Sequence, residues 1–241
     1  MPRSRVGIER GEAFVLRVRD FAESDLIVTL FTTEWGKRTA IAKGARRFKS
    51  RLGGVFDLLN HVEVVFYAKA QLDLISQGAL ISGYPRLKGS IDTVLAALSV
   101  GKLLDRLLPA HQREQAPYMI FEQLLDLLEE RVPQWEQTNL AAMLKIVSVL
   151  GHRPQFTACV HCGSTRGPFR FVPTRGGIVC TKCEGEGINL SRGLALSLNA
   201  LIDRPLPRAG IVRMKKEDLS LAHELVDSYL RELAGTTSRT T

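Results

Sequence analysis

The sequence has no long uncharged apolar run. A membrane-spanning helix needs about 18 or more such residues, and no stretch of this chain supplies them. The first five residues, Met1-Pro2-Arg3-Ser4-Arg5, lead into a charged segment and not into the apolar centre of a secretory signal peptide. We therefore expect a cytoplasmic protein with no membrane attachment.

Motifs of the common enzyme classes are also missing. The chain has no GxxxxGK[ST] phosphate loop, no GxGxxG after a predicted strand and no HExxH metal site. Its five histidines are scattered at positions 61, 111, 152, 161 and 223, with no nucleophile pattern nearby. We expect no enzymatic activity, with a nuclease that uses an unrecognised carboxylate site as the alternative.

Acidic residues are scarce in the first fifth of the chain. The whole sequence holds 33 Lys and Arg against 25 Asp and Glu, a net charge of +8. Residues 1–51 hold twelve basic and six acidic side chains, so this segment alone contributes +6. A local excess of positive charge favours a polyanionic partner such as nucleic acid.

The first 80 residues are predicted to form five short strands. Apolar side chains recur at every second position, as in Phe14/Leu16/Val18 and Val62/Val64/Phe66, and Glu34-Trp35-Gly36 is a plausible turn. The predicted strands cover 13–19, 25–33, 37–43, 61–67 and 72–79. Five strands of this length, with a longer connection after the third, predict an OB-fold barrel, although an SH3-like barrel would give nearly the same pattern.

After Gly83-Tyr84-Pro85 the apolar period becomes helical. The predicted apolar stripes are Ile91/Val94/Leu95/Leu98, Phe121/Leu124/Leu125/Leu128 behind Pro117, and Leu140/Met143/Leu144/Val147 before Gly151, with further helices over 194–202 and 219–233. We interpret these stripes as the core of a bundle and not as a groove for a partner. Residues 235–241 are predicted to be a frayed tail.

The predicted fold class is therefore multi-domain α+β. An OB-fold domain covers residues 1–80, and a helical domain covers residues 81–241. A four-cysteine module at about 157–186 is inserted into the helical domain.

All four cysteines lie in that module. Cys159 and Cys162 form one CxxC pair, and Cys180 and Cys183 form another after seventeen intervening residues. Two such pairs supply four thiolates in a tetrahedron, which predicts one structural Zn²⁺. Disulfides and a redox CxxC are the alternatives; a cytoplasmic chain disfavours the first, and the second would not need two copies. His161 lies inside the first pair and is left out, since four thiols complete the shell.

Residues 137–183 contain no acid but six cations, at Lys145, Arg153, Arg166, Arg170, Arg175 and Lys182. We favour the interpretation that they offset the negative charge of a metal bound by four thiolates. The alternative is that they extend a nucleic-acid surface.

A second acid-free stretch, residues 37–51, contains seven cations. Phe48 lies among them and Trp35 just ahead, so that a mobile basic ridge with aromatic stacking platforms is predicted beside the barrel. We interpret this ridge as a DNA-binding surface, with a merely solvated loop as the alternative. An RNA-binding or ribosome-associated factor would use the same features. The predicted DNA-binding residues are Lys37, Arg38, Lys43, Arg46, Arg47, Lys49 and Arg51.

Several short segments follow one another in an order typical of a known family. They are Ala13-Phe14-Val15-Leu16, Glu23-Ser24-Asp25, Phe31-Thr32 with Gly36, Lys43-Gly44-Ala45-Arg46-Arg47, Ser50-Arg51-Leu52 and Gly83-Tyr84. With the helical region and the late four-cysteine insert, they resemble the RecO family of bacterial DNA repair and recombination mediators over nearly the whole chain. The Lys-Gly-Ala-Arg stretch is the most specific part. Some members of the family lack the cysteines, and this chain resembles the zinc-bearing branch.

The resemblance implies functions that composition does not. These are binding to single- and double-stranded DNA, annealing of complementary strands, and cooperation with RecR to load RecA onto strands covered by single-stranded-DNA-binding protein. The seven basic residues match the family's basic N-terminal surface. The resemblance also implies a pocket in the helical part for the acidic tail of the single-stranded-DNA-binding protein.

Overall fold

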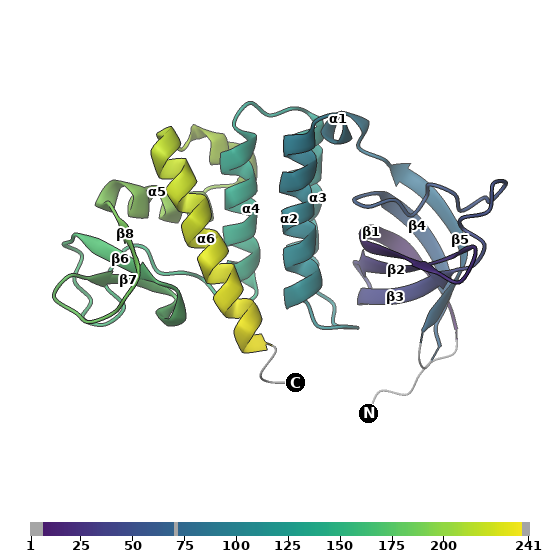
Figure 1. The fold of residues 1–241 in the computed structure, drawn as a ribbon, viewed down its shortest axis with the longest axis horizontal. Helices are drawn as coiled ribbons and strands as arrows, with labels where there is room; N and C mark the ends of the chain where they lie inside the picture. The colour runs from purple at the N-terminus through teal and green to yellow at the C-terminus, as the bar shows by residue number, and fades with distance from the viewer. Residues whose placement is uncertain (1–6, 70–71, 238–241) are drawn as a thin grey trace. The chain divides into compact units, whose positions relative to one another are not determined.

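The computed structural model of the protein describes residues 7–69 and 72–237. Residues Met1–Arg5, on which the signal-peptide prediction depended, lie outside this range. The chain forms two compact units, Met1–Tyr118 and Met119–Thr241, whose elements are labelled in Figure 1. No helix within the described ranges is both long and apolar enough to span a membrane.

The first unit contains a closed barrel of five strands. The strands are β1 (Ile8–Phe21), β2 (Asp25–Thr32), β3 (Gly36–Ala42), β4 (His61–Tyr67) and β5 (Asp73–Ser82). Their order is β1-β2-β3-β5-β4, closed by antiparallel pairing of β1 with β4, while β3 and β5 pair in parallel. This arrangement confirms the OB-like barrel. Gly36, with φ +66°, takes the left-handed conformation required at the predicted turn.

The barrel core corrects the predicted alternation in β1. A bulge shifts the register between Val15 and Arg17, so that Ala13 and Val15 lie in the core, with Val18 packed against it. Phe14 is buried outside that core, with its ring stacked on His61 at 4.4 Å and tilted against Tyr118 at 4.9 Å between centroids. In β4 the predicted face, Val62/Val64/Phe66, is confirmed as core.

The helix α2 (Ile91–Leu107) follows the short α1 (Pro85–Lys88) and contacts β1. Its predicted core stripe is wrong, because Ile91 and Leu95 are 75% and 59% exposed. The buried face instead carries mainly small and branched side chains, among them Ala97, Val100 and Leu104. Apolar residues occur on every side of this helix, so a helical period can be traced along two of its faces. Tertiary packing decides which of the two faces is buried.

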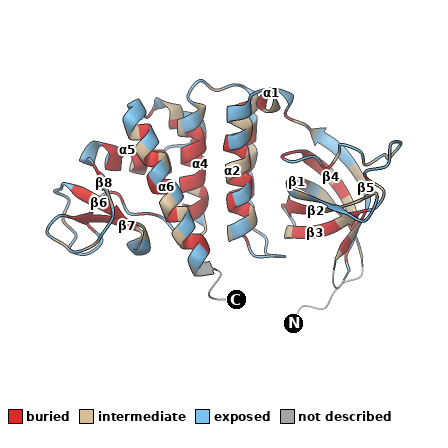
Figure 2. Cartoon of the chain, in the orientation of Figure 1, coloured by how far each residue is buried: buried red, intermediate tan, exposed pale blue. Residues whose placement is uncertain are grey.

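The second unit is helical with a small sheet. Its helices are α3 (Gln115–Glu129, whose first turn belongs to the first unit), α4 (Trp135–Val149), α5 (Arg192–Asp203) and α6 (Lys216–Thr237), with a 3₁₀ helix η2 (Leu206–Ile211). The predicted stripes of α3 and α4 are buried, and α4 contacts both α5 and α6. Figure 2 shows buried residues along α4. Because α6 continues to Thr237, the predicted tail is wrong for 235–237, and residues 238–241 lie outside the described range.

The cysteine module is inserted between α4 and α5, as predicted. Its strands β6 (Phe169–Val172), β7 (Gly177–Cys180) and β8 (Ile188–Leu190) form an antiparallel sheet in the order β7-β6-β8, with a 3₁₀ turn, η1 (Pro173–Arg175), between the first two. Phe171 packs on Phe156 and on Tyr229 of α6. The Tyr229 hydroxyl donates to the His152 carbonyl at 2.9 Å. These contacts join the module to the helices of its unit.

The compact units divide after Tyr118, and the predicted domain boundary between residues 80 and 81 stays a prediction. Residue 80 lies inside β5, and the contacts group α1, α2 and the first turn of α3 with the barrel. Independent folding of residues 1–80 stays a prediction.

Candidate metal centre and nucleic-acid interface

The four cysteines come together at one end of the β6–β7 hairpin. Their Sγ atoms all lie within 4.8 Å of one another. Cys180 ends β7, and the Cys183 N–H donates to its carbonyl at 3.0 Å, closing a tight turn. The Gly163 N–H closes the other turn by donating to the Cys159 carbonyl at 2.9 Å. No other group of this kind occurs in the described ranges, and the exposed His161 is not part of it.

The spacing of the sulfurs fits a bound metal better than disulfides. The Cys180 Sγ lies 3.7 Å from both Cys162 Sγ and Cys183 Sγ, far beyond the roughly 2.05 Å of a disulfide bond. A tetrahedron with metal–sulfur bonds of about 2.3 Å has sulfur–sulfur edges of about 3.8 Å. The four residues could therefore hold one metal ion.

The pKa values of two of the thiols also agree with a site that would bind a cation. Burial opposes ionisation of Cys159, but the N–H groups of Cys180, Cys162 and His161 outweigh it and lower the pKa of Cys159 to about 6. At Cys183, desolvation and the neighbouring thiols raise the pKa to about 12. Four thiolates so close together repel one another, so a cation is needed to hold all of them deprotonated.

The cations of the acid-free stretch around the module do not form one free surface. Lys145 Nζ donates to the Ile202 carbonyl at 2.5 Å, and Arg153 pairs with Asp203 at 2.7 Å. Arg170 donates to the Cys183 carbonyl at 3.0 Å, so it braces the second cysteine pair. The exposed members are Arg153, Arg166, Arg175 and Lys182, and only Arg153 among them forms an ion pair with a described residue.

The seven cations predicted to bind DNA divide into two groups. Arg38 is buried in the barrel, where it pairs with Asp73 at 2.6 Å and with Glu9 at 3.3 Å and lies 5.0 Å from the Phe66 ring centroid. Lys37 Nζ lies 3.5 Å from the Asp105 carboxylate and also donates to the Asp105 carbonyl. Burial lowers the pKa of Lys37, and Asp105 offsets only part of this effect. The interpretation of these two residues as uncompensated surface charges is wrong.

The other five cations form an exposed loop directly after β3. We call residues 43–51 the basic loop; its cations are Lys43, Arg46, Arg47, Lys49 and Arg51. Among these five, an ion pair links Arg46 to Asp20, at 3.1 Å on the exposed surface. Such a pair is weak and easily exchanged for a phosphate.

The backbone is anchored at the start of the basic loop, and the predicted mobility of the ridge stays a prediction. The Gly44 N–H donates to Asp25 Oδ1 at 2.8 Å, and the Arg46 N–H donates to the Ser24 carbonyl at 2.9 Å. Ala45, between them, is buried in the barrel core. The first part of the loop is therefore tied to the barrel, and its charged side chains project from there.

The two aromatic residues proposed as stacking platforms have different environments. Phe48 is fully exposed at the tip of the basic loop. Trp35 packs against the barrel core, 5.4 Å from the Phe66 ring and over Gly11, where a side chain would collide with the indole. Phe48 alone of the two is free to stack on a base.

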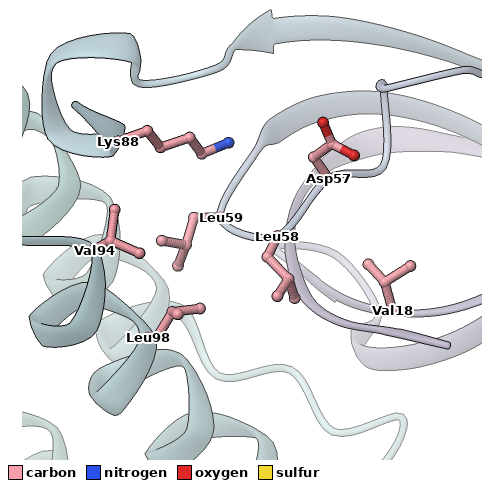
Figure 3. A pocket seen from close by; sticks show the side chains of 7 residues that line it. All are labelled: Val18, Asp57, Leu58, Leu59, Lys88, Val94 and Leu98. Atoms are coloured by element: carbon pink, nitrogen blue, oxygen red, sulfur yellow. The ribbon is translucent and has the colours of Figure 1, made fainter. Parts of the chain in front are cut away.

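Sequence reasoning missed two hollows. The first, of 480 Å³, lies between α2 and the loop before β4 and is lined by Val18, Asp57, Leu58, Leu59, Lys88, Val94 and Leu98. Figure 3 shows Val94 and Leu98 on α2 facing Leu58 and Leu59 of the loop. Val94 and Leu98 belong to the stripe that was predicted to be core, so no periodic signal could have revealed a groove there.

The second hollow lies within the helical unit. It has a volume of 300 Å³, and its lining combines apolar side chains such as Ile120, Val149 and Leu206 with the cations Lys145 and Arg153. From the sequence, the two cations were considered as offsetting the charge of the metal site or as extending a nucleic-acid surface.

Together these features define a class: a protein with an OB-like barrel that carries an exposed basic loop, and a helical unit with four clustered cysteines that could hold a metal ion. The family model for the N-terminal part of recombination protein O matches residues 7–84, and the model for its C-terminal part matches residues 88–240. The chain belongs to the RecO family. The boundary between the two family models lies at α1, whereas the boundary between the two compact units lies after Tyr118.

Individual relatives agree with this assignment. The chain is 36% identical over 226 residues to the DNA repair protein RecO of Symbiobacterium thermophilum, covering 91% of this chain and 89% of that protein. It is 30% identical over 234 residues to the DNA repair protein RecO of Listeria monocytogenes, covering 95% and 90%. The RecO of Desulfitobacterium hafniense is 33% identical over 199 residues, with coverage of 81% and 72%.

Proposed function

We propose that this protein is a non-enzymatic mediator of DNA repair and recombination, which binds single-stranded DNA and anneals complementary strands. The observation that carries the proposal is the basic loop, where five exposed cations and an exposed Phe48 are held on an OB-like barrel. The names of the relatives, DNA repair protein RecO, support DNA as the ligand.

The chemistry of the basic loop suits a phosphate backbone. Arg46, Arg47 and Arg51 can form paired hydrogen bonds with phosphate oxygens, and Lys43 and Lys49 add point charges. Phe48 can stack on a base of any identity, because every base has a π-face. Binding of this kind is independent of sequence, as annealing requires, and weakens as salt rises.

Annealing by this route needs no nucleotide. Two complementary strands pair spontaneously once cations have reduced the repulsion between their phosphates. The protein's part is to bring the strands together, and we propose that it catalyses no bond-making or bond-breaking step.

We further propose a structural Zn²⁺ as the metal held by Cys159, Cys162, Cys180 and Cys183. Four thiolates are typical of structural zinc and leave no open position for water or substrate. When bound, the ion stabilises the module by cross-linking its two turns. Its residues take no part in a reaction.

RecR, RecA and the single-stranded-DNA-binding protein are the proposed partners, in the cytoplasm at the nucleoid. The resemblance to the family supports all three. The hollow that contains Lys145 and Arg153 beside apolar side chains suits the acidic tail of the single-stranded-DNA-binding protein. Arg153 would meet an acidic group by exchanging its exposed pair with Asp203, Lys145 would add positive charge beside it, and the apolar lining would receive a nonpolar side chain.

An annealing experiment tests the proposal. Two complementary strands, one coated with single-stranded-DNA-binding protein, are mixed with the purified protein without ATP, and duplex formation is followed by fluorescence. We expect faster duplex formation than without the protein. No acceleration would contradict the proposal, preferential binding of RNA in competition with DNA of the same sequence would favour the RNA-binding alternative, and metal-dependent cleavage of a labelled strand would reveal a nuclease.

A further inference from the structure

A second run of exposed cations lies in the helical unit, in the connection from α5 to the first residue of α6. Residues 204–216, which we call the interhelix segment, contain no acid. Its five cations are all exposed, and none forms an ion pair or a side-chain hydrogen bond with any residue that the structure describes. They are Arg204, Arg208, Arg213, Lys215 and Lys216.

Buried apolar side chains anchor the interhelix segment. Leu206, Ala209 and Val212 are buried at every third position, which is the period of the 3₁₀ helix η2 that they belong to or follow. η2 contacts α4, and Gly210 lies so close to Gln134 that an added Cβ would be 3.0 Å from that side chain. The buried positions fix which side of the segment meets solvent.

The backbone of the segment is ordered by its own hydrogen bonds. The Arg208 N–H donates to the Pro205 carbonyl at 2.9 Å, and the Val212 N–H donates to the Ala209 carbonyl at 3.0 Å. Two prolines, Pro205 and Pro207, further restrict the chain. The cations therefore project from a rigid connection and not from a flexible linker.

An apolar side chain accompanies the cations. Ile211 is 63% exposed and follows Arg208 by three residues, so the two share one side of the 3₁₀ helix. A cationic surface with an apolar contact is suited to a nucleic-acid strand, because the charges meet phosphates while the apolar group meets a sugar or a base. The nearest acids along the chain are Asp203, which pairs with Arg153, and Glu217 and Asp218 in the first turn of α6.

We propose that the interhelix segment is a second DNA-binding surface, which holds one strand by its phosphates while the basic loop holds another. This inference rests on the proposed function and extends it, since annealing requires that two strands be bound at once. Each surface carries five exposed cations. Two separate surfaces of similar charge would allow one chain to collect two strands that repel each other in solution.

The experiment measures bridging between two strands that cannot pair. The full-length protein is captured on an immobilised oligonucleotide, and retention of a second, fluorescent, non-complementary oligonucleotide is measured against salt. The test variant is R208E/R213E/K215E. A matched control, K102E/R106E/R113E, makes the same change of charge at exposed residues of the first unit, and R208K/R213K keeps the charge of the segment.

We expect the R208E/R213E/K215E variant to be captured on the first strand but to lose bridging. Three lost phosphate contacts, at about 0.7 counterion each, reduce the log–log salt slope for the second strand by about 2. The wild type, the matched control and R208K/R213K should bridge normally. The thermal midpoint should stay near that of the wild type, because the replaced side chains are exposed and unpaired.

The outcomes separate this inference from the function on which it rests. If the wild type binds and anneals DNA but the test variant bridges strands as well as the wild type, the second surface is disproved while the proposed function stands. If the variant bridges DNA normally but loses binding of polyglutamate, the segment is a site for an acidic polypeptide, which also overturns the inference. If the wild type neither binds nor anneals DNA, the proposed function itself fails.

Discussion

At the scale of single residues, burial separates cations that the sequence presents as equivalent. Arg38 and Arg46 lie in the same acid-free stretch, but Arg38 is enclosed in the barrel by Asp73 and Glu9, whereas Arg46 is on the surface. A buried ion pair whose partner is removed leaves an uncompensated charge, while an exposed pair loses little. Arg38 therefore belongs to the architecture of the barrel.

We predict that Asp73→Asn destabilises the protein by about 3 kcal/mol or more, because it leaves the Arg38 guanidinium buried without its main partner. Equilibrium unfolding in urea measures the change. The control is Asp20→Asn, which breaks the exposed pair with Arg46 and should cost less than about 1 kcal/mol. Equal, small effects of the two substitutions would contradict the assignment of Arg38 to the core.

At the scale of structural elements, the basic loop combines a backbone that is anchored at its start with free side chains. Its anchors are backbone hydrogen bonds to Ser24 and Asp25 and the buried Ala45. Its charged side chains make almost no contacts of their own. Changes to those side chains should therefore affect binding and leave folding intact.

We predict that R46E/R47E/K49E weakens binding of single-stranded DNA for every sequence and reduces the log–log salt slope by about 2, from three contacts at about 0.7 each. Fluorescence anisotropy titrations at several salt concentrations measure both effects. The K102E/R106E/R113E variant has the same net charge and should keep the wild-type slope. If the loop variant binds with unchanged affinity and slope, the basic loop is only a solvated loop.

A second prediction at this scale concerns the cysteine module. We expect one zinc per chain in protein purified under reducing conditions without chelator, and Cys180→Ser should lower this content by removing one of four thiolates. Elemental analysis measures the ratio. His161→Ala should leave the content unchanged, since His161 is exposed and outside the cluster. A zinc-free wild type would disprove the zinc assignment.

At the scale of the whole molecule, the two compact units depend on different interactions. The barrel closes on its own strands and core. The cysteine module is joined to the helices of its unit through Phe171, Tyr229 and the carbonyl of His152. Loss of the metal should therefore destabilise the helical unit before the barrel.

We predict that a chelator lowers the stability of the second unit and leaves the barrel folded. The two tryptophans lie in different units, Trp35 in the barrel and Trp135 in α4. In Trp135→Phe protein, the urea midpoint reported by Trp35 should be insensitive to chelator, whereas in Trp35→Phe protein the Trp135 midpoint should fall. A parallel fall of both midpoints would show that the units unfold as one.

Most of the fold could be predicted from local pattern. The alternation of Val62, Val64 and Phe66 identified β4, and the stripes of α3 and α4 identified helices that are buried as expected. The pattern failed where one period fits two faces, as in α2, or where a bulge breaks the period, as after Val15. The same limit applied to the candidate site. The cysteine spacing predicted a cluster, but the sequence of the cationic stretch did not indicate which cations pair with an acidic residue.

What the sequence determined by itself is the chemistry that depends on near neighbours. The CxxC spacings, the excess of cations in residues 43–51 and the periods of the strands and helices are local, because turn geometry and side-chain direction are set within a few residues. Tertiary structure alone decided that Arg38 meets Asp73, that Trp35 covers Gly11 and that Ile91 faces solvent. Those outcomes depend on which distant segments pack together, since burial and pairing are properties of the whole fold and not of a stretch of sequence.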